Sequence, residues 1–408
     1  MRIAIIADTY PPLRTSGAVQ LRDLAREFAI QGHEPTVIVP GDTLGAPSKL
    51  ERADGVTVLR CPTPTTKDVG YVRRTLNEIR LPYALLRALR QSELRDVRWD
   101  GIVSYSPSIF LGPAVRALRA ESRCRSYLIL RDIFPQWAVD MGIMRRGLAY
   151  RFFKAIERYQ YSVADTIGVQ SYANLPYMNA WARRLGCRIE VLQNWLADAP
   201  NTGCSISLEK SKLAGRRIFV YAGNMGVAQG MDVFLELAAR MRGRKDVGFL
   251  FVGRGSDAAR LAAMAESHAL DNVMFHDEID PDEIPGLLAQ CDVGIVALDP
   301  RHKTHNVPGK FLTYMQAGLP VLARINPGND LEKLITEERV GRVCAGGDAA
   351  TLQRLAEQLI ADDHDLGAIR GRGQRLWRRL FSSEAAARQI VAALSPQPPE
   401  PGYRSAPS

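Results

Sequence analysis

The chain has 408 residues, of which 46% are hydrophobic and 24% charged, and its length suits two or three domains with well-developed cores. Its longest apolar runs are strand-sized and its six cysteines lie far apart without metal-ligand spacing, so we expect no membrane-spanning helix, no zinc site and no disulfide framework. The net charge is +9, and all of the excess lies in residues 1–199, which hold 28 basic and 19 acidic residues, whereas residues 200–408 hold 25 of each.

Strand-sized apolar runs alternate with helix-length periodic segments through the first half, which favours a parallel sheet built from βαβ units. The opening run, MRIAIIAD, predicts a buried strand rather than a secretory signal. From the scattered cysteines we expect a protein of the reducing cytoplasm. The predicted strands lie near residues 2–7, 35–40, 56–60, 101–105, 126–131, 165–169 and 188–191.

Polar residues follow two of these strands, at the edge of a parallel sheet where ligands bind. The first strand ends in Asp8, and the loop after it leads through Gly17 into a helix; a plain connection explains Gly17 nearly as well as contact with a substrate. The strand near 126–131 ends in Arg131 and Asp132, which either face a ligand or pair with each other. Their place in the sheet favours a ligand.

Residues 71–91, YVRRTLNEIRLPYALLRALRQ, are basic and amphipathic, and Pro82 predicts that they form two short helices. The apolar positions of one face are Val72, Leu76, Ile79, Tyr83 and Leu86. This face either packs on the sheet or lies on an anionic bilayer surface. A second basic run, RRGLAYRFFKAIERYQYS, has too many apolar positions for one exposed stripe and predicts a core helix.

The polar, aperiodic loop at 194–207 predicts a domain boundary. We expect an N-terminal domain over 1–195, a second domain over 196–383, a helix over 384–395 that crosses back onto the first domain, and a disordered Pro-rich tail over 396–408. The predicted fold class is α/β, with two facing Rossmann-like, doubly wound domains and a ligand cleft between the carboxyl ends of their strands.

The second half predicts strands near residues 217–222, 247–253, 272–276, 293–298, 320–325 and 340–345. Two Gly-rich turns follow strands there. In YAGNMGVAQG, Gly223 permits a tight turn, while Asn224 and Gln229 offer neutral hydrogen-bond donors. VGRGSD repeats the arrangement with Gly253 and Arg254. Each turn alone is more typical of a simple connector than of a phosphate site.

The third loop, DPRHKTHNVPGK, leads into a short helix that Pro308 begins and Gly318 ends. Lys310 therefore lies in the first turn, where a cation opposes the helix dipole by about 0.3 to 1 kcal/mol, and an anionic ligand would offset that cost. Gly309 lets such a ligand approach the free backbone N–H groups. A solvated basic loop explains this stretch equally well, but the three loops together, with Arg254 and Lys310, predict a diphosphate site.

The ordered set of motifs TYPP…SGA, VLQNW, YAGNMG…QG, FVGRGS, NVMFHDEI…IPGLLAQCDVGIVAL and VPGKFLTYMQAGLPVLA resembles the retaining GT-B glycosyltransferases of family four. The resemblance covers about residues 1–395. RDIFPQW and THNVPGKFLTYMQAGLPVLA look closest to bacterial O-antigen and capsule enzymes, particularly N-acetyl-L-fucosamine transferases. The resemblance to the family implies an acceptor site in the first domain, a nucleotide-sugar site in the second, and transfer without a metal or other cofactor.

The residues that match the family's site positions depart from its usual pattern. His305 and Thr313 stand where the family commonly has two Glu residues seven apart, and Asn224 and Gln229 stand where many members have an Arg and a Lys. Arg131 replaces a common His. Thr313 would then bind a ribose hydroxyl and His305 would contact the sugar, while Lys310 and Arg254 supply more of the positive charge.

These observations predict a glycosyltransferase that moves a hexosamine-like sugar from a UDP-sugar to a lipid-diphosphate-linked glycan acceptor at the inner face of the cytoplasmic membrane. The expected donor-binding residues are Gly223, Asn224, Gln229, Gly253, Arg254, Pro308, Gly309, Lys310 and Thr313. The expected acceptor-binding residues are Asp8, Gly17, Arg131 and Asp132. The catalytic candidates are Lys310, Arg254, Asp132 and His305.

Three other functions remain open. The first is a UDP-sugar epimerase on the same two-domain plan, and the second is a protein that binds a membrane or nucleic-acid surface through its basic half. No RNA-binding motif or recognition-helix pattern supports nucleic acid as a partner, so we expect an anionic membrane surface instead. The third, a dinucleotide oxidoreductase, is disfavoured because GNMGVAQG does not give GxGxxG.

Overall fold

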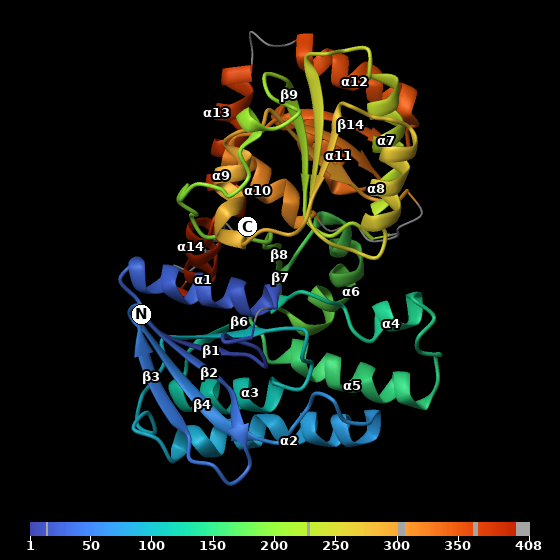
Figure 1. Ribbon diagram of the computed structural model, residues 1–408. Helices are drawn as coiled ribbons and strands as arrows, with labels where there is room; N and C mark the ends of the chain where they lie inside the picture. Colours follow the sequence, from blue (N-terminus) through green and yellow to red (C-terminus); the bar gives the residue numbers. More distant parts are fainter. Residues whose placement is uncertain (14, 227–228, 301–306, 362–365, 397–408) are drawn as a thin grey trace, which may run out of the picture. The chain divides into compact units, whose positions relative to one another are not determined.

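The computed structural model describes residues 1–13, 15–226, 229–300, 307–361 and 366–396, and in it the chain divides into two compact units (Figure 1). The first unit comprises Met1–Leu192 together with the C-terminal segment from Ser383, and the second comprises Gln193–Ser382. Both junctions lie within a few residues of the boundaries expected at 195 and 383. His305 lies outside the described residues.

The first unit is built on an eight-stranded sheet with the order β3-β4-β2-β1-β5-β6-β7-β8, and helices cover both faces of this sheet (Figure 1). Its strands are β1 (Arg2–Ile6), β2 (Glu34–Thr43), β3 (Lys49–Ala53), β4 (Val56–Thr63), β5 (Gly101–Tyr105), β6 (Arg125–Leu130), β7 (Thr166–Val169) and β8 (Arg188–Val191). Every pairing is parallel except that between β3 and β4. The strand order reverses between β1 and β5, where ligands bind in doubly wound sheets.

The antiparallel strand β3 was not predicted. It pairs with β4 through a two-residue turn at Asp54 and Gly55, whose φ angles are 54° and 74°. An Asp-Gly pair between two strand-like runs is the usual signal for this turn, because both central residues need positive φ. Because β3 lies at the sheet edge and is mostly exposed, its sequence, KLERA, is charged. It therefore lacks the apolar run by which the other strands were predicted.

The helices of the first unit are α1 (Ser16–Ile30), α2 (Tyr71–Arg90), α3 (Gly112–Ser122), α4 (Gln136–Asp140), α5 (Leu148–Ser162), α6 (Leu175–Leu185) and α14 (Ser383–Leu394). The last of these returns to the first unit at the end of the chain and packs beside α1. Ser383 Oγ hydrogen-bonds Glu27 Oε2 at 3.3 Å, and Gln389 Nε2 donates to Glu190 Oε1 at 2.7 Å.

Two sequence predictions about these helices were wrong. The helix α2 runs without a break through Pro82, because Leu81, Pro82 and Leu85 are buried on the sheet and this packing offsets the backbone hydrogen bond that proline removes. The sequence left open whether the apolar face of this helix packs on the sheet, and in the structure it does not, since of its five residues only Leu86 is buried and the rest are exposed.

The second error concerns α5, which was predicted to be a core helix. Its only fully buried residues are Glu157, Gln160 and Tyr161, whereas Leu148 is 84% exposed and Phe152 is also exposed. The three buried residues recur at i, i+3 and i+4, which is one narrow stripe of the helix. The many apolar positions of α5 therefore include a face that the rest of the unit does not cover.

The second unit holds a six-stranded, entirely parallel sheet with the order β11-β10-β9-β12-β13-β14. Its strands are β9 (Arg217–Ala222), β10 (Val247–Val252), β11 (Val273–His276), β12 (Val293–Ala297), β13 (Val321–Ile325) and β14 (Gly341–Ala345). Its helices are α7 (Asp232–Arg240), α8 (Ala258–Ser267), α9 (Ile284–Leu288), α10 (Gly309–Ala317), α11 (Asp330–Glu338), α12 (Ala349–Ala361) and α13 (Leu366–Leu376), followed by a π-helical turn at Trp377–Phe381.

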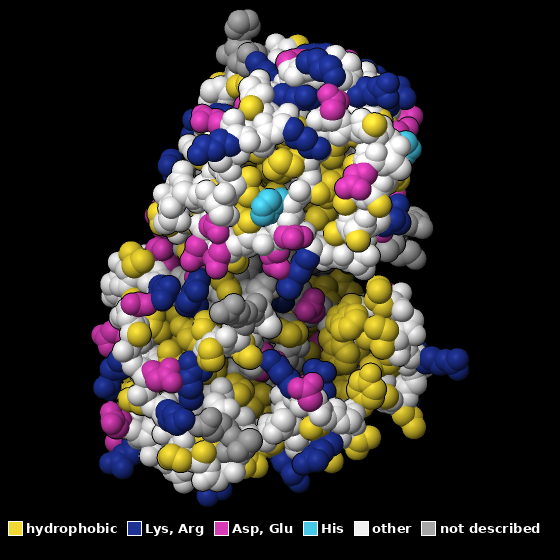
Figure 2. All heavy atoms as spheres, viewed as in Figure 1, with side chains coloured by type: hydrophobic (Ala, Val, Ile, Leu, Met, Phe, Trp, Pro, Cys, Tyr) yellow, Lys and Arg dark blue, Asp and Glu magenta, His cyan; other side chains and the backbone are white. Residues whose placement is uncertain are grey.

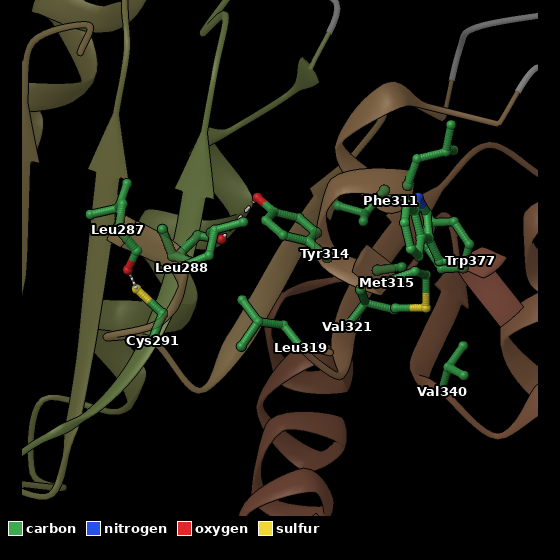
Figure 3. Packing of buried hydrophobic residues seen from close by; sticks show 14 of the residues in the cluster. Leu287, Leu288, Cys291, Phe311, Tyr314, Met315, Leu319, Val321, Val340 and Trp377 are labelled. Carbon is green, nitrogen blue, oxygen red and sulfur yellow. Dashed lines mark hydrogen bonds between the residues drawn. The ribbon is translucent and has the colours of Figure 1, made fainter. Parts of the chain in front are cut away.

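The central strands of this unit are buried on both faces, as their continuous apolar sequences predict. On β9, Ile218 and Val220 join one hydrophobic cluster while Phe219 and Tyr221 join the other. Buried residues of α10 also belong to the first cluster (Figure 3). The strand order reverses between β9 and β12, so the second unit has its own ligand edge beside the start of α10.

Among the described residues, none of the helices combines the length and apolar character that a bilayer crossing requires.

Candidate functional site

The two Gly-rich turns of the second unit pack backbone against backbone. Gly223 N–H donates to Val252 O at 2.8 Å, and Met225 N–H donates to Arg254 O at 2.7 Å. A Cβ on Gly253 would overlap the carbonyl of Gly223, and the φ of Gly253 is 138°. Both facts exclude a side chain there. The turns after β9 and β10 thus form one compact surface beside α10.

The start of α10 is held against this surface by the core below it. Phe311, Tyr314 and Met315 point into the hydrophobic cluster in Figure 3, and the Tyr314 hydroxyl donates to Val220 O at 3.2 Å. A Cβ on Gly294 would overlap the Tyr314 ring, so the absence of a side chain there lets the helix approach the sheet. The core therefore fixes where the first turn of α10 lies.

Lys310 lies in that first turn, and its side chain runs along Gly223. A Cβ on Gly223 would come 2.7 Å from Lys310 Cε and 3.0 Å from Nζ, so only glycine leaves room for the amine. The ammonium lies 4.7 Å from the centre of the Tyr221 ring, a cation–π contact. Within the described part of the chain, Lys310 has no hydrogen-bond or ion-pair partner.

Burial lowers the pKa of Lys310 from 10.5 to about 8. A buried cation without a counter-ion is unfavourable, and an anionic ligand beside it would restore the missing interaction. Lys310 also lines a cavity of about 230 Å³ with Gly223, Gly253 and Thr313. The site thus offers a positive charge that no described residue pairs, at a sheet edge bordered by the glycine backbone of two turns.

The neighbours of Lys310 on α10 have less specific roles. Pro308 is the N-cap of the helix, and Gly309 follows as its first residue, so the N–H groups of Gly309 and Lys310 have no carbonyl four residues back within the helix. A Cβ on Gly309 would meet no atom within 4 Å, so a ligand can approach from that side. Thr313 Oγ1 donates to Gly309 O at 3.2 Å and keeps its lone pairs for a donor group on a ligand.

The other predicted donor-site residues are already engaged within the protein. The Asn224 amide donates to Gln229 Oε1 at 3.4 Å, and the same oxygen accepts the N–H of Gly226 at 3.0 Å. These two residues therefore brace the turn. Arg254 is exposed and does not line the cavity, but its Nε lies 3.0 Å from Oε2 of Glu278, a residue of the cavity wall, so its charge is already paired with that carboxylate.

Sequence reasoning missed Tyr221 and Glu278. Tyr221 lies in a strand that reads only as a buried apolar run, and its contact with Lys310 depends on how α10 crosses the sheet. Glu278 belongs to a loop after β11, in the stretch HDEI, and lines the cavity beside Gly253. An acidic residue directly after a strand of the same sheet was the available signal.

In the first unit, Asp8 and Asp132 line one cavity of about 610 Å³ at the carboxyl ends of β1 and β6. Its apolar walls are Tyr71, Pro107, Ile109, Phe110, Phe134, Trp137, Ala138, Ile143, Met144 and Phe153. Burial and the nearby Glu78 raise the pKa of Asp8 to about 6. Desolvation also raises the pKa of Asp132, against the opposing effect of Arg131. This cavity combines carboxylates with aromatic surface.

Gly17 and Arg131 do not line that cavity. Arg131 donates to Gln20 Oε1, which also accepts the Tyr105 hydroxyl at 3.4 Å. A Cβ on Gly17 would come 3.0 Å from the same hydroxyl, so this glycine makes room for the network at the start of α1. Arg131 therefore holds α1 against the sheet, and no ion pair between Arg131 and Asp132 occurs among the described residues.

Two family models match the chain. One, described as "Glycosyl transferase 4-like domain", matches residues 16–195, and the other, "Glycosyl transferases group 1", matches residues 216–362. Together they cover most of both units.

Within the described residues, no three or more His, Cys, Asp or Glu side chains are grouped so that they would hold a metal ion.

Curated relatives and solved structures agree with these matches. A probable glycosyltransferase of Pseudomonas aeruginosa, WbjE, is 26% identical over 73% of this chain and 75% of its own. A putative colanic acid biosynthesis glycosyl transferase of Escherichia coli K12, WcaI, is 24% identical over 78% and 82%. The structure of Anabaena HepE in complex with UDP superimposes with a TM-score of 0.61 at 14% identity, covering 97% and 99% of the two chains.

Proposed function

We propose that the chain, whose two units match the two glycosyltransferase family models, transfers a sugar from a UDP-sugar to a lipid-diphosphate-linked acceptor. The sugar we propose is N-acetyl-L-fucosamine or a related hexosamine, the product is an O-antigen or capsular polysaccharide, and transfer proceeds with retention and without a metal. The names of the two curated relatives, one of them a colanic acid biosynthesis enzyme, support a role in polysaccharide synthesis. The UDP bound to the Anabaena neighbour supports the choice of nucleotide.

The observation that carries this proposal is the position of Lys310. Its ammonium is desolvated, has no ionic partner in the described part of the chain, and lies against Gly223 at the ligand edge of the sheet. A diphosphate placed there would receive the charge of Lys310 and the N–H groups at the start of α10. Gly253 would let the phosphates approach the backbone, and Thr313 Oγ1 would accept a hydrogen bond from a ribose hydroxyl.

The chemistry follows from where charge develops. The bond between the sugar C1 and the phosphate oxygen breaks, the bond between C1 and the acceptor oxygen forms, and UDP leaves with the bonding electrons. Lys310 stabilises this developing charge on the leaving phosphate. In a same-face attack, that phosphate oxygen takes the proton of the acceptor hydroxyl. Asp132 is the candidate to assist, because its raised pKa favours holding a proton.

The acceptor assignment rests on the cavity of the first unit. Carboxylates such as Asp8 and Asp132 accept hydrogen bonds from sugar hydroxyls, and aromatic walls such as Phe134 and Trp137 pack on apolar surface. Such a mixed lining suits an acceptor that presents a sugar beside hydrocarbon. We place the enzyme at the inner face of the cytoplasmic membrane, where such acceptors are found.

The test is a titration with UDP in the absence of metal, followed by the thermal midpoint of unfolding. A ligand at 100 times its dissociation constant stabilises by about 2.7 kcal/mol, so the wild-type midpoint should rise clearly. Lys310→Met removes the charge with little change of volume and should abolish the rise. The matched control is Lys333→Met, an exposed lysine on α11 of the same unit, which should respond as the wild type does.

Turnover separates the transferase from its rivals. With UDP-hexosamines and a lipid-diphosphate acceptor, product should form only when both substrates are present. Conversion of the UDP-sugar without acceptor would instead indicate an epimerase. An unchanged UDP response in Lys310→Met would contradict the assigned role of Lys310.

A further inference from the structure

Exposed apolar residues gather on one edge of the first unit. We call this the apolar edge and define it by Trp137, Met141, Ile143, Leu148 and Phe152, which come from α4, the segment after it and the start of α5. Ile143 is 69% and Leu148 is 84% exposed. Figure 2 shows hydrophobic side chains massed over the region where Figure 1 draws α4 and α5.

Ring contacts join α4 to the start of α5 within the apolar edge. Trp137 contacts the Phe134 ring at 6.2 Å between centroids, Phe134 contacts Phe153 at 5.2 Å, and Phe153 contacts Phe152 at 5.2 Å. The backbone N–H of Ile143 donates to Ala138 O at 2.9 Å, which folds the connecting segment onto α4. Burial of this surface against an apolar phase would therefore require no refolding.

Positive charge surrounds the apolar edge. Arg145, Arg146 and Arg151 interleave with its apolar residues, and none of their guanidinium groups has an ion-pair or hydrogen-bond partner within the described residues. The stretch from Gln136 to Ser162 carries five basic residues and only two acidic ones. Of the two acids, Glu157 is buried and bound to Lys154, Tyr161 and Tyr177. The charge on this edge is thus complementary to an anionic surface.

We propose that the apolar edge inserts into the acyl region of an anionic lipid leaflet, with the three arginines at the level of the headgroups. The inference deepens and rests on the proposed function, since it names the membrane-contacting surface of an enzyme that takes a lipid-linked acceptor. It assigns the contact with the membrane to α4 and α5, whereas the sequence suggested only the segment that forms α2. A second copy of the chain fits less well, because a two-fold interface would bring these arginines together.

The acceptor cavity supports the same arrangement. Trp137 and Ile143 belong both to the apolar edge and to the lining of the cavity that holds Asp8 and Asp132. The cavity therefore opens beside the surface that we place in the lipid. An acceptor anchored in the leaflet would reach the two carboxylates without leaving the membrane.

The test measures binding of the full chain to vesicles. Vesicles of phosphatidylglycerol and phosphatidylcholine should retain the protein, whereas phosphatidylcholine alone should retain much less. Trp137 is the one exposed tryptophan of the chain's five, the other four being buried, so insertion should shift its emission to the blue. Trp137→Phe should lose that spectral change while keeping most of the binding.

Two variants decide the outcome. Ile143→Ser combined with Leu148→Ser should lower the vesicle partition coefficient about tenfold or more. The matched control Ile30→Ser alters a residue that is 78% exposed on α1, away from the edge, and should bind as the wild type does. Equal binding of the double variant and the wild type would overturn the inference. So would light scattering that shows a dimer which the double variant dissociates.

The UDP titration in the same preparations keeps the two proposals apart. If vesicle binding fails while UDP still raises the thermal midpoint, only the membrane surface is wrong. If UDP has no effect while vesicle binding depends on Ile143 and Leu148, the transferase proposal fails and the membrane surface stands.

Discussion

Both units are doubly wound sheets with a cavity beside the point where their strand order reverses, yet the two cavities are lined by different chemistry. The cavity of the second unit is small, bordered by glycine backbone, and contains the ammonium of Lys310. That of the first is larger and holds three carboxylates, Asp8, Glu78 and Asp132, against one cation, Arg74. The same fold position therefore suits a diphosphate in one unit and a hydroxyl-bearing, partly apolar molecule in the other.

The comparison also locates the excess charge. The first half of the chain carries all of the net positive charge, but its cavity is acidic, so the arginines must act elsewhere. Many of them lie on α2 and α5, beside exposed apolar side chains. Every large hydrophobic residue that is exposed within the described part of the chain belongs to the first unit. Basicity in this protein is thus a property of a surface, not of the acceptor cavity.

The largest effect should come from Gly253→Ala, which tests whether the backbone packing of the second unit is essential. The added Cβ overlaps the Gly223 carbonyl at a φ that disfavours any side chain, so we expect a loss of about 3 kcal/mol in unfolding free energy and no response to UDP. Gly243→Ala is the control, because a Cβ there meets no atom within 4 Å. Thermal unfolding with and without UDP measures the stability and the UDP response of each variant. A normal UDP response in Gly253→Ala would show that UDP binding does not need the close backbone packing of the two turns.

The first unit should respond to pH through Asp8. Its pKa is raised from 3.8 to about 6, so the folded state binds a proton that the unfolded state releases, and stability present below about pH 4 is lost as pH rises through 6. Asp8→Asn removes this loss. We expect it to gain about 1 to 2 kcal/mol at pH 7.5 and almost nothing at pH 4, after allowance for partial exposure.

Thermal midpoints at the two pH values measure this effect. Asp96→Asn, at an exposed site on the same unit, should change neither midpoint. An Asp8→Asn variant that gains as much at pH 4 as at pH 7.5 would show that the carboxylate is not the source of the penalty.

The second unit should respond to pH through Lys310, whose pKa is lowered, whereas that of Asp8 is raised. The pKa of Lys310 is lowered to about 8, so the charged form that binds a diphosphate is lost as pH rises through that value. We expect the affinity for UDP to fall about tenfold between pH 7 and pH 9, with one proton taken up on binding at the higher pH. Calorimetric titrations in two buffers measure both quantities. Lys310→Arg stays charged, so its affinity should be flat over this range if the arginine binds at all.

The sequence predicted most of the fold because its central strands are apolar on both faces and stand out as continuous runs. VGFLFV is such a run, and it forms β10. The errors arose where tertiary packing decides. Pro82 lies within a helix because buried neighbours hold it there, and α5 reads as a core helix although much of its apolar surface has no cover. Periodicity states which residues share a face but not what lies against that face.

The candidate sites were predictable to a similar degree. Lys310, Gly223 and Gly253 are brought together because each follows a neighbouring strand, which the order of the elements indicates. The roles of Asn224, Gln229 and Arg254 were not predictable, because their partners depend on side-chain directions within the turns. Asp8 and Asp132 share a cavity, but its aromatic walls come from α2, α4, α5 and the loops after β5 and β6, all of which lie far from Asp8 in the sequence.

The smallest effect should come from Arg254→Gln, which asks whether the second unit uses one cation or two. Arg254 is 80% exposed and already paired with Glu278, and an exposed pair of this kind contributes less than about 1 kcal/mol. We therefore expect the affinity for UDP to fall less than about fivefold, far less than in Lys310→Met. Removing the partner with Glu278→Gln frees the guanidinium and takes a negative charge from the cavity wall, so affinity should rise slightly. If Arg254→Gln instead abolishes UDP binding, Arg254 exchanges Glu278 for the diphosphate when the ligand binds, and the ion pair seen here is a resting state of the site.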